Sequence, residues 1–156
     1  MALKNYTTDI PVYKTVSEIH EMLARHGARK VMFDYTADGR INAICFTIIG
    51  PYGHGEQAVK LPANADKVLA VLKNQKNDTK NRNRDRITAT SEQAEMVAWR
   101  IVKDWLDAQL AILETEMVDI QQVFLPYFID RNGKTLYEAF KAGDIGLLSD
   151  GSGGSI

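Results

Sequence analysis

The sequence is poor in the residues that build disulfide frameworks and metal centres. Its 156 residues include a single cysteine and only three histidines. One cysteine excludes an internal disulfide and a cysteine-rich zinc site. Cys45 lies in an apolar, strand-like run, where an inert buried thiol is more common than a nucleophile. We therefore expect no metal and no cofactor.

Excess charge, long apolar runs and catalytic motifs are also lacking. The net charge is −1, so the whole chain has no general attraction for nucleic acid or anionic membrane. Residues 1–9 are polar and no stretch approaches the length of a membrane span, which predicts a cytoplasmic protein. A P-loop, G-x-G-x-x-G, H-E-x-x-H or G-x-S-x-G motif is absent. We expect a binding protein rather than an enzyme.

The order of the patterns that are present predicts an α+β fold. A capping box at Thr15 and Glu18 begins the first helix, and Gly27 ends it. Three strands follow at residues 29–35, 41–49 and 56–61, joined by turns. A second helix begins near Asn64. The expected fold is a small antiparallel three-stranded meander flanked by helices (α-β-β-β-α), followed by one long helix and a short helical C-terminal segment.

The predicted boundaries are a single domain at residues 1–148 and a flexible glycine- and serine-rich tail at 149–156. The glycine-rich turn at residues 50–55 places Tyr52 and His54 at a loop tip, where recognition residues are often found. Glycines at such positions are also common in ordinary hairpins. Tyr52 and His54 are therefore candidate binding residues with a structural alternative.

The long helix is predicted from Thr90 to Met117, with Thr90 and Gln93 as its capping box. Its apolar seam consists of Ala94, Ala98, Ile101, Trp105, Ala108 and Ile112. Further apolar residues cover most of its circumference, more than one small sheet can bury. The helix is either the core of a monomer or the interface of a homo-oligomer, and we favour the oligomer.

Residues 73–86, KNQKNDTKNRNRDR, form the one compositional break. Six basic and two acidic residues give a local charge of +4, with no apolar residue, which predicts a solvated loop. Arginine suits phosphate, and the loop leads into the anion-favouring start of the long helix. A tryptophan and two cations on that helix could complete a site by stacking on a base. The candidate ligand-binding residues are Lys80, Arg82, Arg84, Arg86, Trp99, Arg100 and Lys103. The alternative is a core tryptophan and a solvated charge run.

Four stretches cover most of the chain: KNYTTDIPVYKTVSEIHEMLARHGA, KLPAN, SEQAEMVAWRIVKDWLDAQLA and VFLPYF..RNGKTLYEAF. Together they resemble a family of small proteins from phages and prophages of Firmicute-type bacteria. The resemblance implies an accessory phage protein in the bacterial host cell. Such proteins often act on phage nucleic acid or disarm a host defence, sometimes by sequestering a nucleotide signal. The resemblance implies no residue roles.

The element order also resembles that of double-stranded-RNA-binding domains. The second helix of those domains begins with several lysines, whereas here that start, PANADK, contains one, so support for RNA is weak.

These observations lead us to expect a host-defence antagonist that sequesters a phosphate-bearing nucleotide between subunits. One alternative is a nucleic-acid-binding accessory protein for phage replication or recombination. Another is a protein–protein inhibitor of a host factor that uses the long helix and residues 124–128. Binding to many phosphates should depend steeply on salt, whereas binding of a small ligand should not.

Overall fold

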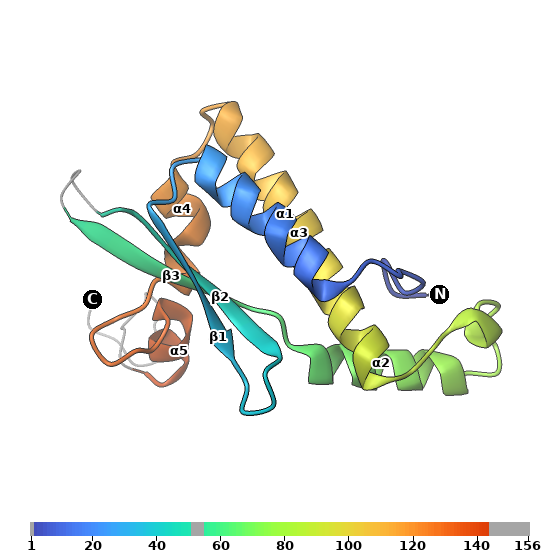
Figure 1. Ribbon diagram of the computed structural model, residues 1–156. Coiled ribbons are helices and arrows are strands. Elements are labelled where there is room, and N and C mark those ends of the chain that lie inside the picture. The colour runs from blue at the N-terminus through green and yellow to red at the C-terminus, as the bar shows by residue number, and fades with distance from the viewer. Residues whose placement is uncertain (1, 51–54, 144–156) are drawn as a thin grey trace, which may run out of the picture.

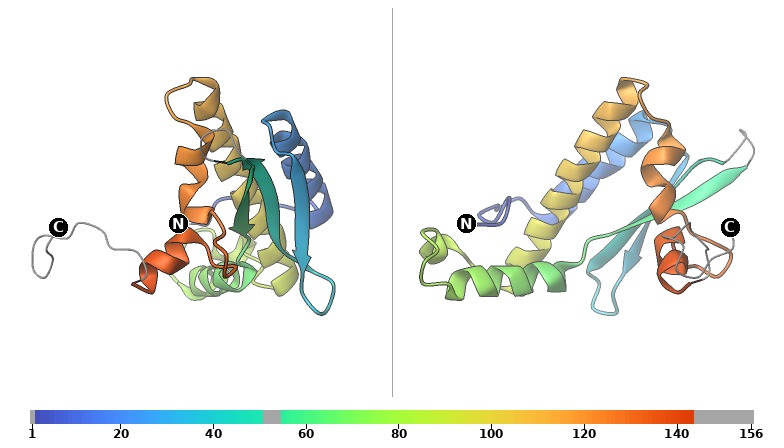
Figure 2. Two further views of the ribbon diagram at one scale, coloured as in Figure 1. Left: turned by 90° about the vertical axis from the view of Figure 1, so that its left-hand side faces the viewer. Right: turned by 180° about the vertical axis from the view of Figure 1, so that it is seen from behind.

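The computed structural model describes residues 2–50 and 55–143. Strands β1 (Lys30–Tyr35), β2 (Ile41–Ile49) and β3 (Glu56–Pro62) form an antiparallel sheet in that order. Helices α1 (Val12–Arg25) and α3 (Ser91–Glu114) lie side by side against one face of it (Figures 1 and 2). Helix α2 (Ala65–Asn77) packs on the N-terminal part of α3 and extends away from the sheet (Figure 1). The predicted α+β fold is confirmed.

The side chains of the sheet alternate between an inner face in the core and an outer face that carries two ion pairs. Five residues of the inner face belong to the main core: Ile44, Phe46, Ile48, Val59 and Leu61. On the outer face, Lys30 pairs with Glu56 at 3.2 Å and Lys60 pairs with Asp34 at 3.0 Å. Each ion pair crosses over β2, the central strand. Helices α1 and α3 therefore lie against the inner face.

Helix α3 is buried by its own chain over its first half. Ala94 packs in a small cluster with Leu72 and Ile87, and Ala98 belongs to the main core. The prediction that these two alanines face another copy is therefore wrong. Helices α1 and α2 and the sheet bury the first half of α3, which we expected another copy of the chain to bury. Further along the predicted seam, Ala108 is exposed, whereas Ile101, Trp105 and Ile112 are partly buried.

One predicted helix start and one predicted capping box differ from the structure, although Thr90 is the N-cap of α3 as expected. Helix α1 begins at Val12, after Pro11, and Thr15 is buried inside it. Proline suits this boundary, since its fixed φ and missing N–H cost nothing where a helix starts. Thr90 does accept a hydrogen bond from the backbone N–H of Gln93 at 3.2 Å. The side chain of Gln93 instead donates to backbone carbonyls of the N-terminal segment.

The C-terminal elements are α4 (Ile120–Phe124), the 3-10 helix η3 (Leu125–Tyr127) and α5 (Leu136–Lys141). Phe128 forms a bridge with Val59, and the Ile129 N–H donates to the Ala58 carbonyl at 3.0 Å. The edge of β3 is therefore paired. The proposed tail at 149–156 and the loop-tip residues Tyr52 and His54 lie outside the described residues.

The N-terminal segment, residues 2–10, ties α2 to α3. The Leu3 N–H donates to Gln75 Oε1 of α2 at 2.9 Å. Gln93 Nε2 of α3 donates to the carbonyls of Tyr6 and Thr8 at 3.0 and 2.9 Å. Leu3 and Tyr6 also pack against the small cluster around Leu72. This segment therefore fixes how the two helices meet.

Asp104 anchors the same segment, so its protonation should release it. Burial acts to raise the pKa of Asp104, but the hydrogen bond from Asn5 (2.8 Å) and the charges of Lys4 and Lys103 leave that pKa below its ordinary value. A lowered pKa adds stability above the unfolded value, about 3.9 for Asp, and that stability is lost as pH falls. We expect the protection of the Leu3 and Tyr6 amides, measured against the free-peptide exchange rate at the same pH, to fall below pH ~4 and in Asp104→Ala at neutral pH. Asp107→Ala is the control, and equal effects of both variants would contradict this role.

Candidate functional site

The strongest charge feature of the fold is the segment at residues 73–86, which we call the basic arm. Its six cations are Lys73, Lys76, Lys80, Arg82, Arg84 and Arg86. It comprises the last turns of α2, the turn that follows, and the 3-10 helix η2 (Arg84–Arg86). In two views the arm projects from the end of the molecule opposite the sheet (Figures 1 and 2). Asp78 and Asp85 are the acidic residues within it, so it keeps a charge of +4 (six basic, two acidic).

The turn after α2 is ordered even though it contains no apolar residue. The buried side chain of Asn81 donates to the Gln75 carbonyl at 3.1 Å and accepts from the Asn83 N–H at 3.0 Å. Ile87 then inserts into the small cluster beside Leu72. The predicted loop is thus real, but helix α2 includes its first five residues, and its backbone is fixed by Asn81. The cations are held at set positions.

Just over half of the other lysines and arginines have an acidic partner in the described part of the chain, whereas none of the six cations of the arm has one there. Within residues 2–50 and 55–143, no ion pair involves any of the six. Lys76 donates to the Ile87 carbonyl at 2.6 Å, so its charge helps to close the turn. Lys80, Arg82 and Arg86 are exposed, and Arg84 is half-buried. The arm thus presents positive charge that the fold does not neutralise.

The other three predicted ligand residues lie elsewhere, and two of them are paired. Trp99 is 1% exposed and belongs to the main core, so a base cannot stack on it in this structure. Arg100 donates to Glu18 of α1 at 2.8 Å, and Lys103 pairs with Asp107 at 3.2 Å. The expected combination of arm, tryptophan and helix cations is therefore not formed, because α1 packs against that part of α3.

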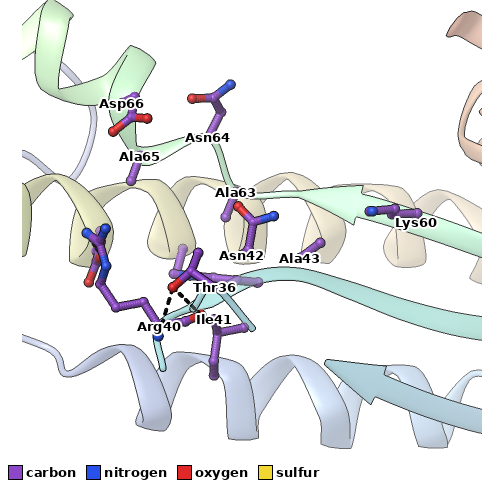
Figure 3. A pocket seen from close by; sticks show the side chains of 12 residues that line it. Thr36, Arg40, Ile41, Asn42, Ala43, Lys60, Ala63, Asn64, Ala65 and Asp66 are labelled. Carbon is purple, nitrogen blue, oxygen red and sulfur yellow. Dashed lines mark hydrogen bonds and ion pairs between the residues drawn. The ribbon is translucent and has the colours of Figure 1, made fainter. Parts of the chain in front are cut away.

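A polar pocket of about 330 Å³ lies where the strands meet the start of α2 (Figure 3). Its lining comes from five parts of the chain: Thr36, Arg40, Ile41, Asn42, Ala43, Lys60, Ala63, Asn64, Ala65, Asp66, Glu95 and Trp99. The size is at the lower end of the range for small-molecule sites. Sequence reasoning did not find this pocket, since no motif links residues this far apart in the chain.

The two cations of the polar pocket, Arg40 and Lys60, are already paired with carboxylates. Arg40 contacts Asp38 at 2.9 Å and Glu95 at 2.6 Å, and the bond to Glu95 is the main reason why its pKa is raised. The hydrogen bond to Asp34 likewise raises the pKa of Lys60. Both cations therefore have a carboxylate partner. Because Asp66 adds a carboxylate without an ion-pair partner among the described residues, the pocket is unsuited to phosphate.

A smaller apolar groove of about 240 Å³ lies beside the second half of α3. It is lined by Leu61, Ile101, Val102, Trp105 and Tyr127. Two residues of the predicted oligomer seam, Ile101 and Trp105, thus face this groove. Trp105 also makes edge-to-face ring contacts with Phe124 and Tyr127. Its indole therefore already has packing partners within the chain.

Other features of the described chain point to no further chemistry. Burial raises the pKa of the Cys45 thiol, which disfavours the reactive thiolate. The described residues contain no cluster of His, Cys, Asp and Glu side chains suited to a metal ion. Among the helices that are described, none has the length and apolar character needed to cross a membrane. Comparison with family models, curated proteins and solved structures finds no match to the chain.

Proposed function

We propose that this protein binds the phosphate backbone of nucleic acid through the basic arm, without catalysis. The observation that carries the proposal is the projecting group of six cations, none of which has an acidic partner among residues 2–50 and 55–143. Phosphate neutralisation by lysine and arginine supplies most non-specific affinity for nucleic acid. A local patch can serve this purpose even though the whole chain has a net charge of −1.

The position of the arm favours an extended polyanion over a single enclosed nucleotide. None of its six cations lines the polar pocket or the apolar groove. A sequestered nucleotide signal, which the sequence favoured, also loses Trp99 as a stacking partner because that side chain is buried. Contacts to phosphate carry no sequence information by themselves. We therefore expect binding that depends little on base sequence, as would suit an accessory protein of phage replication or recombination.

Salt dependence provides the direct test. We expect a fluorescently labelled DNA duplex to bind with an affinity that falls steeply as salt rises. In the triple variant Arg82→Gln, Arg84→Gln, Arg86→Gln, the logarithmic salt slope should become shallower by about 3, since each lost phosphate contact removes roughly 0.9. The measurement is fluorescence anisotropy over a salt series, repeated with a second duplex of unrelated sequence.

A matched control removes the same charge elsewhere. Arg131, Lys134 and Lys141 are exposed, lie near α5 and form no ion pair among the described residues. Changing these three residues to Gln should leave the salt slope almost unchanged. Equal losses in the two triple variants would show a general charge effect and contradict the arm as the site. Absence of DNA and RNA binding at low salt would refute the proposal.

A further inference from the structure

Strand β1 is an open edge of the described sheet. It pairs with β2 on one side, and no described residue pairs with its other side. The opposite edge, β3, is covered by Phe128 and Ile129. Met32, in the middle of β1, is 66% exposed, and its neighbours Val31 and Phe33 are only partly buried. An unpaired edge with apolar side chains is a template for another strand.

We propose that β1 of a second copy of this chain pairs with this edge, antiparallel, about a two-fold axis at Met32. The strand sequence, KVMFDY, is complementary to itself in this register. Lys30 lies opposite Asp34 of the second copy, and Val31 lies opposite its Phe33. Met32 meets Met32. An isologous contact of this kind closes with two copies.

The two faces of the sheet agree with this register. Lys30 and Asp34 lie on the outer face, where each already has a partner on β3. Val31 and Phe33 pack towards the core on the inner face. Pairing about Met32 keeps charges with opposite charges and apolar residues with apolar residues. Such cross-strand pairs stabilise antiparallel sheets.

Other registers lose this match. A shift by one residue places Val31 opposite Asp34 and mixes the two faces of the sheet. Pairing about Phe33 instead places Met32 opposite Asp34 and leaves Lys30 without an acid. The register irregularity between Asp34 and Tyr35 also ends the regular ladder there. Pairing about Met32 therefore includes every residue of the regular part of β1, residues 30–34.

In the proposed dimer, the ion pairs on the outer face continue from one copy into the other. In the paired sheet, Glu56, Lys30, Asp34 of the second copy and Lys60 of the second copy form one row of alternating charge. The two-fold repeats that row on the other side of Met32. The same register that pairs the apolar residues therefore also pairs the charges of the two copies. With only five residues paired per strand, we expect a weak, reversible dimer.

Cysteine cross-linking tests the register. Cys45 is the β2 partner of Met32, so Cys45→Ala is introduced first to prevent an internal disulfide. In that background, Met32→Cys should give a disulfide-linked dimer under mild oxidation, since residues that face each other across a two-fold lie about 4.5–5.5 Å apart at Cα. The measurement is non-reducing electrophoresis of the full chain over a concentration series.

Lys30→Cys in the same background is the control. In the proposed register the two copies of residue 30 are four positions apart, roughly 13 Å, which is too far for a disulfide. We expect dimer from Met32→Cys and almost none from Lys30→Cys. Equal cross-linking of both variants, or none from Met32→Cys, would overturn the proposal.

Sedimentation equilibrium tests the same edge without oxidation. The unmodified protein should approach the mass of two chains as its concentration rises, whereas Met32→Lys should stay near one chain. Because Met32 is exposed, the melting temperature of the variant should not change. A mass of one chain for the unmodified protein at every concentration would refute the dimer. This outcome is independent of DNA binding, which is measured separately.

Discussion

Replacing Trp99 by alanine is expected to lower the free energy of unfolding by about 3–5 kcal/mol, because a buried indole leaves a large cavity. The side chain is 1% exposed and belongs to the main core, beneath the sheet. A loss of this size is a large part of the total stability of a small domain. The free energy of unfolding of Trp99→Ala therefore distinguishes a core role for Trp99 from a role in ligand binding.

Chemical denaturation of Trp99→Ala and Trp99→Phe measures the effect. Trp99→Phe should lose much less stability, since a smaller part of the side-chain volume is removed. Any Trp99→Ala protein that remains folded at low temperature should still bind DNA, because the basic arm lies elsewhere. Normal stability together with lost binding would show instead that Trp99 belongs to a ligand site.

Phe124→Ala is expected to cost a similar amount, about 3–5 kcal/mol. The ring is fully buried and meets Phe46 edge to face, with centroids 5.2 Å apart and planes at 82°. It also contacts Trp105 at 6.3 Å. Phe124 thus attaches α4 to both the sheet and α3. We expect the C-terminal elements to exchange amide hydrogens faster in this variant, as seen by mass spectrometry.

The adjacent residue provides a control for Phe124. Leu125 is 47% exposed, so Leu125→Ala should change the free energy of unfolding by no more than about 0.5 kcal/mol. Denaturation of the two variants under identical conditions compares neighbouring positions that differ in burial. Similar losses in both would contradict the role assigned to the ring of Phe124.

The elements of the fold could be predicted because each has a local signal. Residues 29–35 alternate, residues 41–49 form an apolar run, and turn residues such as Gly39 separate the strands. The capping box of Thr135 and Glu138 marks the start of α5, and the structure forms it. Periodicity also found the apolar faces of α3. Periodicity does not show which partner buries each face, and the chain itself buries Ala94 and Ala98, the two alanines of the predicted interface.

The candidate site likewise has one part that the sequence predicts and other parts that it does not. The basic arm is local in sequence, so composition alone predicted an exposed positive segment. Arg100 is held by an ion pair with Glu18, 82 residues away, and no local sequence pattern predicts that contact. The polar pocket likewise combines residues such as Arg40 and Asp66 from separate elements. Long-range packing is what sequence reasoning lacked.

The N-terminal segment has a further mechanical consequence. Its hydrogen bonds to Gln75 and Gln93 join the base of the arm to the rest of the molecule. A protease that cut between Thr8 and Val12 would leave the sheet, α1 and α3 whole. It would nevertheless weaken the hydrogen bonds that link Gln75 of α2 and Gln93 of α3 through this segment, and leave α2 held on α3 by the cluster of Leu72, Ile87 and Ala94. The first turns of the chain thus brace the helix from which the positive charge projects.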